Sequence, residues 1–361
     1  MSAGRALLLG LVLAGCAASQ RGELARQGAA AERAYSAGRY AEAATRWGEI
    51  ADKARRPADR DEARYRQGAS LVRAGQPALA RAIFDRLLQD SPNGVRGPRA
   101  ALDRARLEEE AGRAADAEKS LEWLIENHPE SGLAPAALHD LLELLAPRGE
   151  VAIRAYLDAR LPLLENTELG EHLHAAYAAS LERSGDLAGA RSRYLLVAER
   201  YPYPGGALWD DALFHAADLA ARRGAPAQAI RDLERMLSKR EAAYIQGSYE
   251  RGRYGEAQYR IAELYRDALH DAVRARAEFE RLWSAHRTSR LRDDAAWNAA
   301  QLAAGAGDAA GACADLEALV RELPSSRYVG CASRLCPLLK TPPQAGACHE
   351  YLTRAQGEPR D

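Results

Sequence analysis

Aromatic, sulfur-containing and lysine residues are scarce in this sequence. Its 361 residues include three phenylalanines, five tryptophans and two methionines, and only four of the 50 basic residues are lysines. The longest apolar run, residues 6–14, is too short to span a bilayer as a stable helix. Acidic and basic residues nearly cancel to a formal net charge of −1, which argues against a general nucleic-acid-binding protein.

Motifs for catalysis and metal binding are also missing. The sequence contains no Gly-x-Ser-x-Gly, phosphate-loop or dinucleotide-binding pattern, and its eight histidines lack metalloprotease spacing. His172 and His174 would lie on different faces of a helix. Asp210-Asp211 and Asp293-Asp294 stand where helices should begin, and the helix dipole explains such pairs. The sequence therefore predicts no enzyme, no cofactor and no metal; an enzyme with an unrecognised site is the less favoured alternative.

What is abundant is alanine, arginine, leucine and glutamate, which lose little side-chain freedom in a helix. A short pattern recurs among them: glycine, then alanine five positions later, then a large apolar residue four positions beyond. It begins at Gly38, Gly75, Gly112, Gly185, Gly224 and Gly307. The first two intervals are 37 residues. The interval from Gly112 to Gly185 is about twice as long, which predicts a degenerate unit at Gly149. The interval from Gly224 to Gly307 predicts a hidden unit and an insertion, and a helix over 272–284 that carries Phe279 fits the hidden unit.

The pattern has a simple physical meaning. Glycine permits the left-handed turn at which one helix ends and a second begins. The alanine lets the two helices approach closely, and the large residue on the same face fills the groove between them. Prolines at 92, 129, 202 and 324 then close several units. Each unit is thus predicted to be a helical hairpin.

This pattern resembles the tetratricopeptide repeat, and its second unit, with Gly68, Gly75, Ala80, Phe84 and Pro92, matches best. The resemblance implies an all-α fold, an α-solenoid of about eight tetratricopeptide-like hairpins forming a right-handed superhelix. Most units lack the family's leading tryptophan, and the period is longer than usual. The proline-then-serine joins are similar to those of the helical-repeat lipoproteins of the outer-membrane barrel-assembly machine and of the Tol-Pal coordinator type.

The first residues have the pattern of an export signal. Arg5 precedes the apolar run, which ends in Leu13-Ala14-Gly15-Cys16 and resembles a bacterial lipobox. An ordinary cleaved signal with an incidental cysteine is the alternative. Acyl chains on Cys16 would anchor the chain. Ala17 favours the periplasmic face of the outer membrane, with the inner membrane as the alternative. The predicted divisions are a signal peptide at 1–15, a lipidated tether at 16–23, the array at 24–340, and a capping helix and tail at 341–361.

The other four cysteines lie near the end of the sequence. In an exported protein an even number of cysteines favours disulfides, although a zinc site or free thiols would also fit. Pro342 and Pro343 predict a turn between two short helices. Such a turn would pair Cys336 with Cys348, and Cys313 with Cys331 less firmly.

The leading function is a scaffold that binds protein partners of the cell envelope through the groove lined by the first helix of each hairpin. A structural spacer is the alternative. Tyrosines 244, 249, 254, 259 and 265 form a further cluster that could bind a partner. The resemblance implies that the residues facing the groove bind acidic or extended protein segments, and not nucleic acid or small molecules. The alternative is that these arginines are simply solvated, since arginines face outward in most proteins. The groove positions are Tyr65, Arg73, Arg99, Arg106, Arg183, Phe214, Arg222, Arg260 and Trp297.

Overall fold

A computed structural model describes residues 22–239, 253–342, 346–349 and 352. Throughout these residues the regular structure is helical, and no strand occurs among them. The chain is helical over 22–36. The α-helices that follow are α2 (Tyr40–Lys53), α3 (Pro57–Arg73), α4 (Pro77–Asp90), α5 (Gly97–Glu110), α6 (Ala114–Asn127), α7 (Ala134–Leu145), α8 (Glu150–Leu164), α9 (Gly170–Arg183), α10 (Leu187–Arg200), α11 (Trp209–Arg222), α12 (Pro226–Leu237), α13 (Arg253–Glu263), α14 (Ala272–Ala285), α15 (Arg292–Gly305), α16 (Ala309–Glu322) and α17 (Ala332–Leu335).

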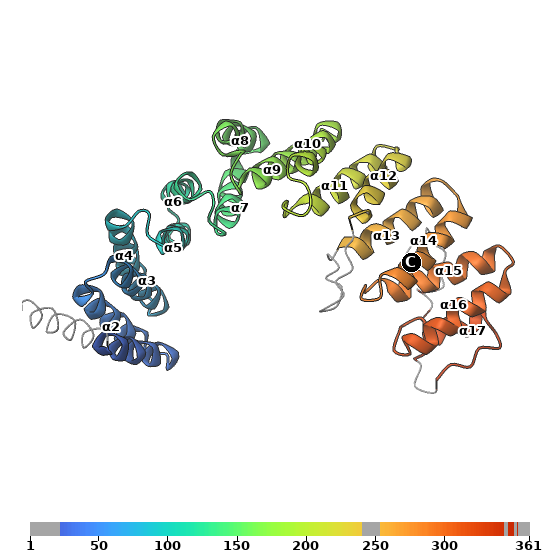
Figure 1. Cartoon of the computed structure of the whole chain (residues 1–361), viewed down its shortest axis with the longest axis horizontal. Coiled ribbons are helices and arrows are strands. Elements are labelled where there is room, and N and C mark those ends of the chain that lie inside the picture. Colours follow the sequence, from blue (N-terminus) through green and yellow to red (C-terminus); the bar gives the residue numbers. More distant parts are fainter. Residues whose placement is uncertain (1–21, 240–252, 343–345, 350–351, 353–361) are drawn as a thin grey trace, which may run out of the picture. The chain divides into compact units, whose positions relative to one another are not determined.

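These helices form eight successive hairpins, which confirms the predicted all-α helical-repeat solenoid. We call the helix over 22–36 and the odd-numbered helices α3 to α15 the first-row helices, and the even-numbered helices α2 to α16 the second-row helices. The chain divides into two compact units, Met1–Leu173 and His174–Asp361, which are described separately. In the first unit α4, α6 and α8 lie in one row and α3, α5 and α7 in another (Figure 1).

The turn within each hairpin is set by one residue with positive φ. At the end of α3, Gly75 has φ +71°; its N–H donates to the Val72 carbonyl, and the N–H of Gln76 donates to the Leu71 carbonyl. This pair of bonds satisfies carbonyls that the ending helix leaves open. Gly149, predicted as the centre of a degenerate unit, has φ +86° and confirms that unit. In the seventh hairpin the residue is His270, with φ +53°, which explains why a search for glycines missed this turn.

The contact between the two helices of a hairpin follows the predicted rule. In the second hairpin, Ala80 and Phe84 are both fully buried, and a Cβ on Gly68 would lie 2.4 Å from a carbon of the Phe84 ring. A side chain at 68 would therefore force the helices apart. The hidden unit also obeys the rule, because Ala275 and Phe279 on α14 are fully buried. The sequence thus identified the packing residues of these two hairpins.

The insertion before the seventh hairpin lies only partly within the described residues. Tyr244 and Tyr249 fall outside them. Tyr254 and Tyr259 belong to α13, and Tyr265 lies in the π-helical turn Leu264–Ala268 that ends it. Tyr254 is buried and the other two are half-buried. The described tyrosines therefore help to pack a first-row helix, and they do not form a separate exposed cluster.

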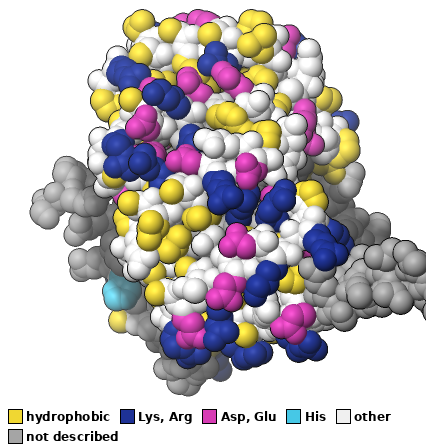
Figure 2. All heavy atoms as spheres, turned by 90° about the vertical axis from the view of Figure 1, so that its left-hand side faces the viewer, with side chains coloured by type: hydrophobic (Ala, Val, Ile, Leu, Met, Phe, Trp, Pro, Cys, Tyr) yellow, Lys and Arg dark blue, Asp and Glu magenta, His cyan; other side chains and the backbone are white. Residues whose placement is uncertain are grey.

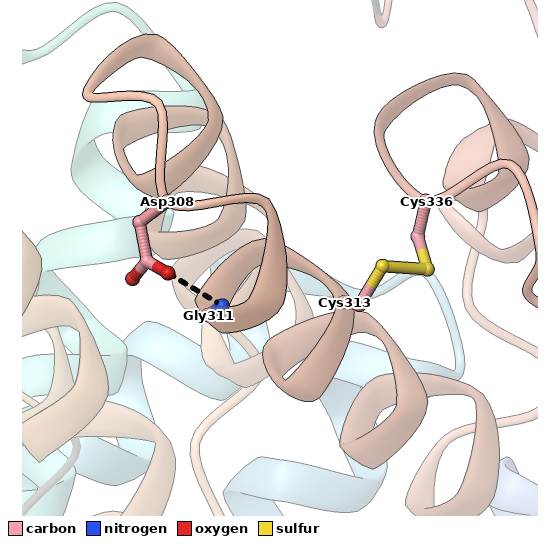
Figure 3. Close-up of a disulfide and its surroundings, with 4 residues drawn as sticks. All are labelled: Asp308, Gly311, Cys313 and Cys336. Carbon is pink, nitrogen blue, oxygen red and sulfur yellow. Dashed lines mark hydrogen bonds between the residues drawn. A yellow bond between two sulfur atoms is a disulfide. The ribbon is translucent and has the colours of Figure 1, made fainter.

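All four C-terminal cysteines form disulfides, but the predicted pairing is wrong. The bonds join Cys313 to Cys336 (Figure 3) and Cys331 to Cys348. The prediction assumed two short helices on either side of Pro342. Instead, α17 has four residues and ends at Leu335, and the described residues 337–342 and 346–349 are not helical.

The observed pairing follows from how the chain returns over the last hairpin. Cys336 comes directly after α17 and meets Cys313 on α16, with a Cα–Cα distance of 5.1 Å. The chain then passes so close to Gly330 that a Cβ there would lie 2.0 Å from the Gly346 carbonyl oxygen. This passage places Cys348 beside Cys331, at a Cα–Cα distance of 4.5 Å. Nearby, the N-cap Asp308 accepts a 2.9 Å hydrogen bond from the Gly311 amide and begins α16 (Figure 3).

The two ends of the sequence lie largely outside the described residues. Cys16 and the predicted signal peptide are not among them, and of the predicted capping helix over 341–361 only 341–342, 346–349 and 352 are described. Leu352 packs with Trp297 and Tyr328 in one buried cluster. Among the helices that are described, none is both long and apolar enough to cross a bilayer.

The disulfide pairing can be tested by peptide mapping, because each of the four cysteines lies on a different tryptic peptide. Without reduction, we expect peptide 293–321 linked to 335–340, and 328–334 linked to 341–354. Mass spectrometry of the non-reduced digest, with thiols blocked before cleavage, identifies the links. A link between 335–340 and 341–354 would support the sequence-based pairing and contradict the structure.

Candidate binding surface

In the first unit, charged and polar side chains of successive first-row helices bind one another. Arg96, at the start of α5, donates two hydrogen bonds to Glu62 on α3, one of them 2.9 Å long. Tyr65 on α3 donates a 3.0 Å hydrogen bond to Asp103 on α5. Arg106 on α5 and Asp140 on α7 approach to 3.7 Å. Hydrogen bonds and ion pairs between side chains therefore link each of these first-row helices to the next.

The same arrangement continues in the second unit. Arg222 on α11 pairs with Glu182 on α9, and Arg253 at the start of α13 pairs with Asp211 on α11. Arg260 on α13 lies 3.4 Å from Asp218 on α11. Asp211 belongs to one of the two acidic pairs predicted at helix starts, and both pairs do lie in the first turns of α11 and α15. Asp211 thus also contacts the next repeat, which the sequence did not reveal.

A cavity of about 250 Å³ opens beside α11 in the second unit. Tyr194 and His215 stack on each other with ring centroids 4.9 Å apart and both line the cavity, and Asp211 and Arg253 complete its polar side. Arg253 also lies over the Phe214 ring, 4.8 Å from its centroid. Burial lowers the pKa of His215, and the Arg253 charge adds to this effect. Burial also raises the pKa of Tyr194 to about 12. Both rings are therefore neutral near pH 7, beside one ion pair.

The structure separates the predicted groove residues into three groups by burial. Tyr65, Phe214 and Arg260 are half-buried, and Trp297 is buried. The exposed members are Arg73, Arg99, Arg106, Arg183 and Arg222. Most of the arginines already have partners within the chain: Arg73 lies over the Tyr40 ring, and Arg99 pairs with Asp103. A partner segment would therefore have to compete with these contacts.

The prediction that Trp297 faces an open groove is wrong. Its side chain is 3% exposed and stacks on Tyr328, with ring centroids 5.1 Å apart. The ring lies in the buried cluster that includes Cys331 and Cys336. Phe214 is intermediate, because it packs against the core of the second unit while Arg253 covers it. The sequence pattern could not distinguish these two aromatic residues, since both occupy first-row helices.

Across the described residues, no three histidine, cysteine, aspartate or glutamate side chains come together in a way that could hold a metal ion. The surface charges are also mixed: Figure 2 shows basic and acidic side chains interleaved over the face that it draws. In the part of the chain that the structure describes, the first-row surface offers arginines, half-buried rings and the cavity beside α11 as binding features.

Comparison with known proteins agrees with this architecture. A family model described as a tetratricopeptide repeat matches residues 62–94, the unit that the sequence pattern singled out. The match covers α3 from residue 62 onward and all of α4, including Gly68 and Phe84. No curated protein matches the chain.

Solved structures of tetratricopeptide proteins align with most of the chain, but at low identity. A repeat protein from Parabacteroides merdae is 13% identical, with TM-score 0.36, covering 76% of this chain and 98% of that one. The C-terminal part of a repeat-containing protein from Cytophaga hutchinsonii is 14% identical, with TM-score 0.46, covering 75% and 99%. The Pseudomonas aeruginosa protein pilF is 13% identical, with TM-score 0.33, covering 74% and 93%.

Two alanine variants test the different positions of the aromatic residues. We expect Trp297→Ala to lower the free energy of unfolding by about 3–5 kcal/mol, because it removes a buried ring from the last hairpin. Phe214→Ala should lower it by roughly half as much, since that ring is only partly buried. Denaturant titration followed by circular dichroism measures both. Equal stability of the wild type and Trp297→Ala would place Trp297 outside the core.

Proposed function

We propose that this protein is a lipid-anchored periplasmic scaffold at the outer membrane that binds protein partners through its first-row helices. It would act within an envelope complex for assembly or transport. Tetratricopeptide repeats are built to present an extended surface of this kind, because each repeat contacts only its neighbours and adds one helix to the row. The proposal joins two separate claims, the anchor and the binding surface, and each has its own test.

The observation that carries the binding claim is the cavity beside α11. Its two neutral rings offer apolar contact area, and the Phe214 ring under Arg253 lies directly next to it. An acidic side chain from a partner could take the place of Asp211 on Arg253, because a guanidinium group binds either carboxylate in the same geometry. A segment of extended chain with an acidic residue beside an apolar residue fits this combination.

The anchor rests on the sequence of the first 16 residues, which lie outside the described part of the chain. An apolar run that ends in Leu-Ala-Gly-Cys supports lipid attachment to Cys16. The two disulfides agree with an exported protein, since disulfides persist in oxidising compartments. Ala17 after the cysteine supports the outer membrane.

A structural spacer is the second candidate, and one observation favours it. The first-row arginines are largely neutralised by acidic side chains of adjacent helices, for example Arg222 by Glu182 and Arg96 by Glu62. A surface whose charges satisfy one another offers less to a partner. A spacer would need a stable array but no specific contact at the cavity.

The lipid anchor predicts that labelled palmitate enters the wild-type protein and not Cys16→Ser. The thiol of Cys16 is the attachment point, so its removal eliminates the acceptor. Metabolic labelling of cells that produce each form, followed by immunoprecipitation, measures incorporation. Cys313→Ser, which removes a different cysteine and leaves Cys16 in place, serves as a control and should still be labelled. Equal labelling of the wild type and Cys16→Ser would contradict the anchor.

The binding claim predicts position-specific crosslinking in intact envelopes. A photo-reactive phenylalanine in place of the exposed Arg222 should capture partners, whereas the same group in place of the exposed Val273 on α14 should not. Adding Phe214→Ala should reduce capture about fivefold, as expected for loss of about 1 kcal/mol at an interface anchor. Circular dichroism confirms that the double variant is folded. Equal capture from both positions, or none from position 222, would favour the spacer.

A further inference from the structure

Four of the turns that follow second-row helices share one feature, and the turn at Gly94 has the same backbone without it. After the second-row helix, Ser131, Thr167, Ser289 and Ser326 each place a hydroxyl that accepts a hydrogen bond from the amide two residues later, at 3.2–3.3 Å. Between the second and third hairpins the corresponding residue is Gly94. Its N–H donates to the Ser91 carbonyl, just as the N–H of Ser326 donates to the Leu323 carbonyl. The backbone turn is therefore kept while the hydroxyl is lost.

The missing hydroxyl matters because of the residue that it would face. In the eighth hairpin, the Ser326 hydroxyl donates a 2.8 Å hydrogen bond to Asp293 Oδ2, and the Asp294 amide donates to Asp293 Oδ1 at 3.0 Å. Asp61 occupies the same place in the second hairpin, 14 residues before the turn glycine. A Cβ on Gly94 would lie 3.1 Å from Asp61 Oδ2. Asp61 thus faces Gly94 as Asp293 faces Ser326.

Oδ2 is the Asp61 oxygen that faces Gly94, and the other oxygen, Oδ1, is an unfilled acceptor. The Asp61 side chain is 5% exposed, and its Oδ1 accepts no hydrogen bond from the described residues. The neighbouring cations bind other carboxylates: Arg56 binds Asp59, Arg64 binds Asp90 and Arg96 binds Glu62. A buried carboxylate without a donor is unfavourable, so a ligand that supplies one should bind here.

Asp61 lines a cleft of about 730 Å³ between the start of α3 and the α4–α5 join. Pro57, Ala58, Pro92 and Val95 form its apolar walls, and the Val95 side chain is 94% exposed at the rim. Glu62 and Arg96 also line the cleft, and they form an ion pair with each other. An apolar passage that leads to a carboxylate matches a lysine or arginine side chain, whose long alkyl stem packs on apolar surface while its charged end reaches an acceptor. The cleft has room for that side chain and for residues on either side of it.

We propose that the Asp61–Gly94 cleft is a second docking site, one that takes a basic side chain of a protein partner. It lies at the edge of the first unit where helices are joined, and it uses none of the residues of the α11 cavity. Loss of binding at one site would therefore leave the other intact. The proposal depends on one acidic residue, one glycine and the apolar walls between them.

A pair of short peptides tests the site on the full mature chain. The probe is acetyl-Ala-Leu-Lys-Leu-Ala-amide, and its control carries norleucine, which keeps the alkyl stem but lacks the ammonium group. Titration is followed by the methyl signals of Val95 and Ala58 in a methyl-labelled sample, with the Val95 signal assigned from Val95→Ala. We expect saturable shifts with the lysine peptide and at least tenfold weaker binding of the norleucine peptide. Equal binding of the two peptides would overturn the proposal.

Three variants locate the interaction. Asp61→Asn and Gly94→Ser should each weaken the lysine peptide at least tenfold, the first by removing the charge and the second by supplying the missing hydroxyl. Asp293→Asn changes the matching, already bonded residue and should leave binding unchanged. Unchanged binding to Asp61→Asn would show a non-specific attraction. Equally tight binding of free lysine amide would show a site for small amines, and either result overturns the docking site.

Thermal melting provides a readout that does not depend on the probe. Asp293→Asn should lower the melting temperature, because both oxygens of Asp293 accept hydrogen bonds. Asp61→Asn should leave the melting temperature unchanged or raise it, since no described partner is lost. A fall for Asp61→Asn as large as that for Asp293→Asn would show that Asp61 supports the fold, and would contradict a vacant acceptor.

Discussion

The close crossing of two helices at a small residue is the contact on which the rest of this structure depends. Ala80 and Phe84 show its elements, because the alanine allows approach and the ring fills the space that remains. A helix of 14 residues would be marginal alone, so each one is stable only when its apolar face is covered. The left-handed turn, the joins and the paired arginines all follow from helices held at this spacing.

That contact also explains why much of the fold could be predicted from the sequence. A rule with fixed spacing leaves a periodic trace, and this trace located Gly149 and Phe279 even where the pattern was degenerate. The turn at His270 could not be predicted, because nothing in the sequence marks a histidine that adopts the left-handed backbone conformation. The pairing of the cysteines could not be predicted for a related reason. It depends on an irregular return of the chain past Gly330, which no periodic pattern describes.

The candidate surface could be predicted only in outline, because exposure on a first-row helix depends on the neighbouring repeat. Trp297 is covered by Tyr328, which follows the last full hairpin, whereas Phe214 is covered by an arginine that follows an insertion. Similarly, Arg96 and Arg222 each pair with a glutamate of the preceding hairpin, a contact that an isolated hairpin would lack. The sequence shows which side chains are aromatic or charged. It does not show which of them are covered, because the covering residues lie in the neighbouring repeat, about 30 to 40 residues away along the chain.

The crossed disulfides have a mechanical consequence for the array. In a stack where each hairpin contacts only its neighbours, the hairpins at the two ends lose contacts first. Here the chain beyond α16 is tied back by Cys313–Cys336 and Cys331–Cys348, and these two covalent loops overlap along the sequence. The last hairpin cannot peel away by separating α16 from the chain that follows it. Neither bond reaches the seventh hairpin, so force or heat can still detach the last hairpin, but α16 and the chain that follows it must then leave together.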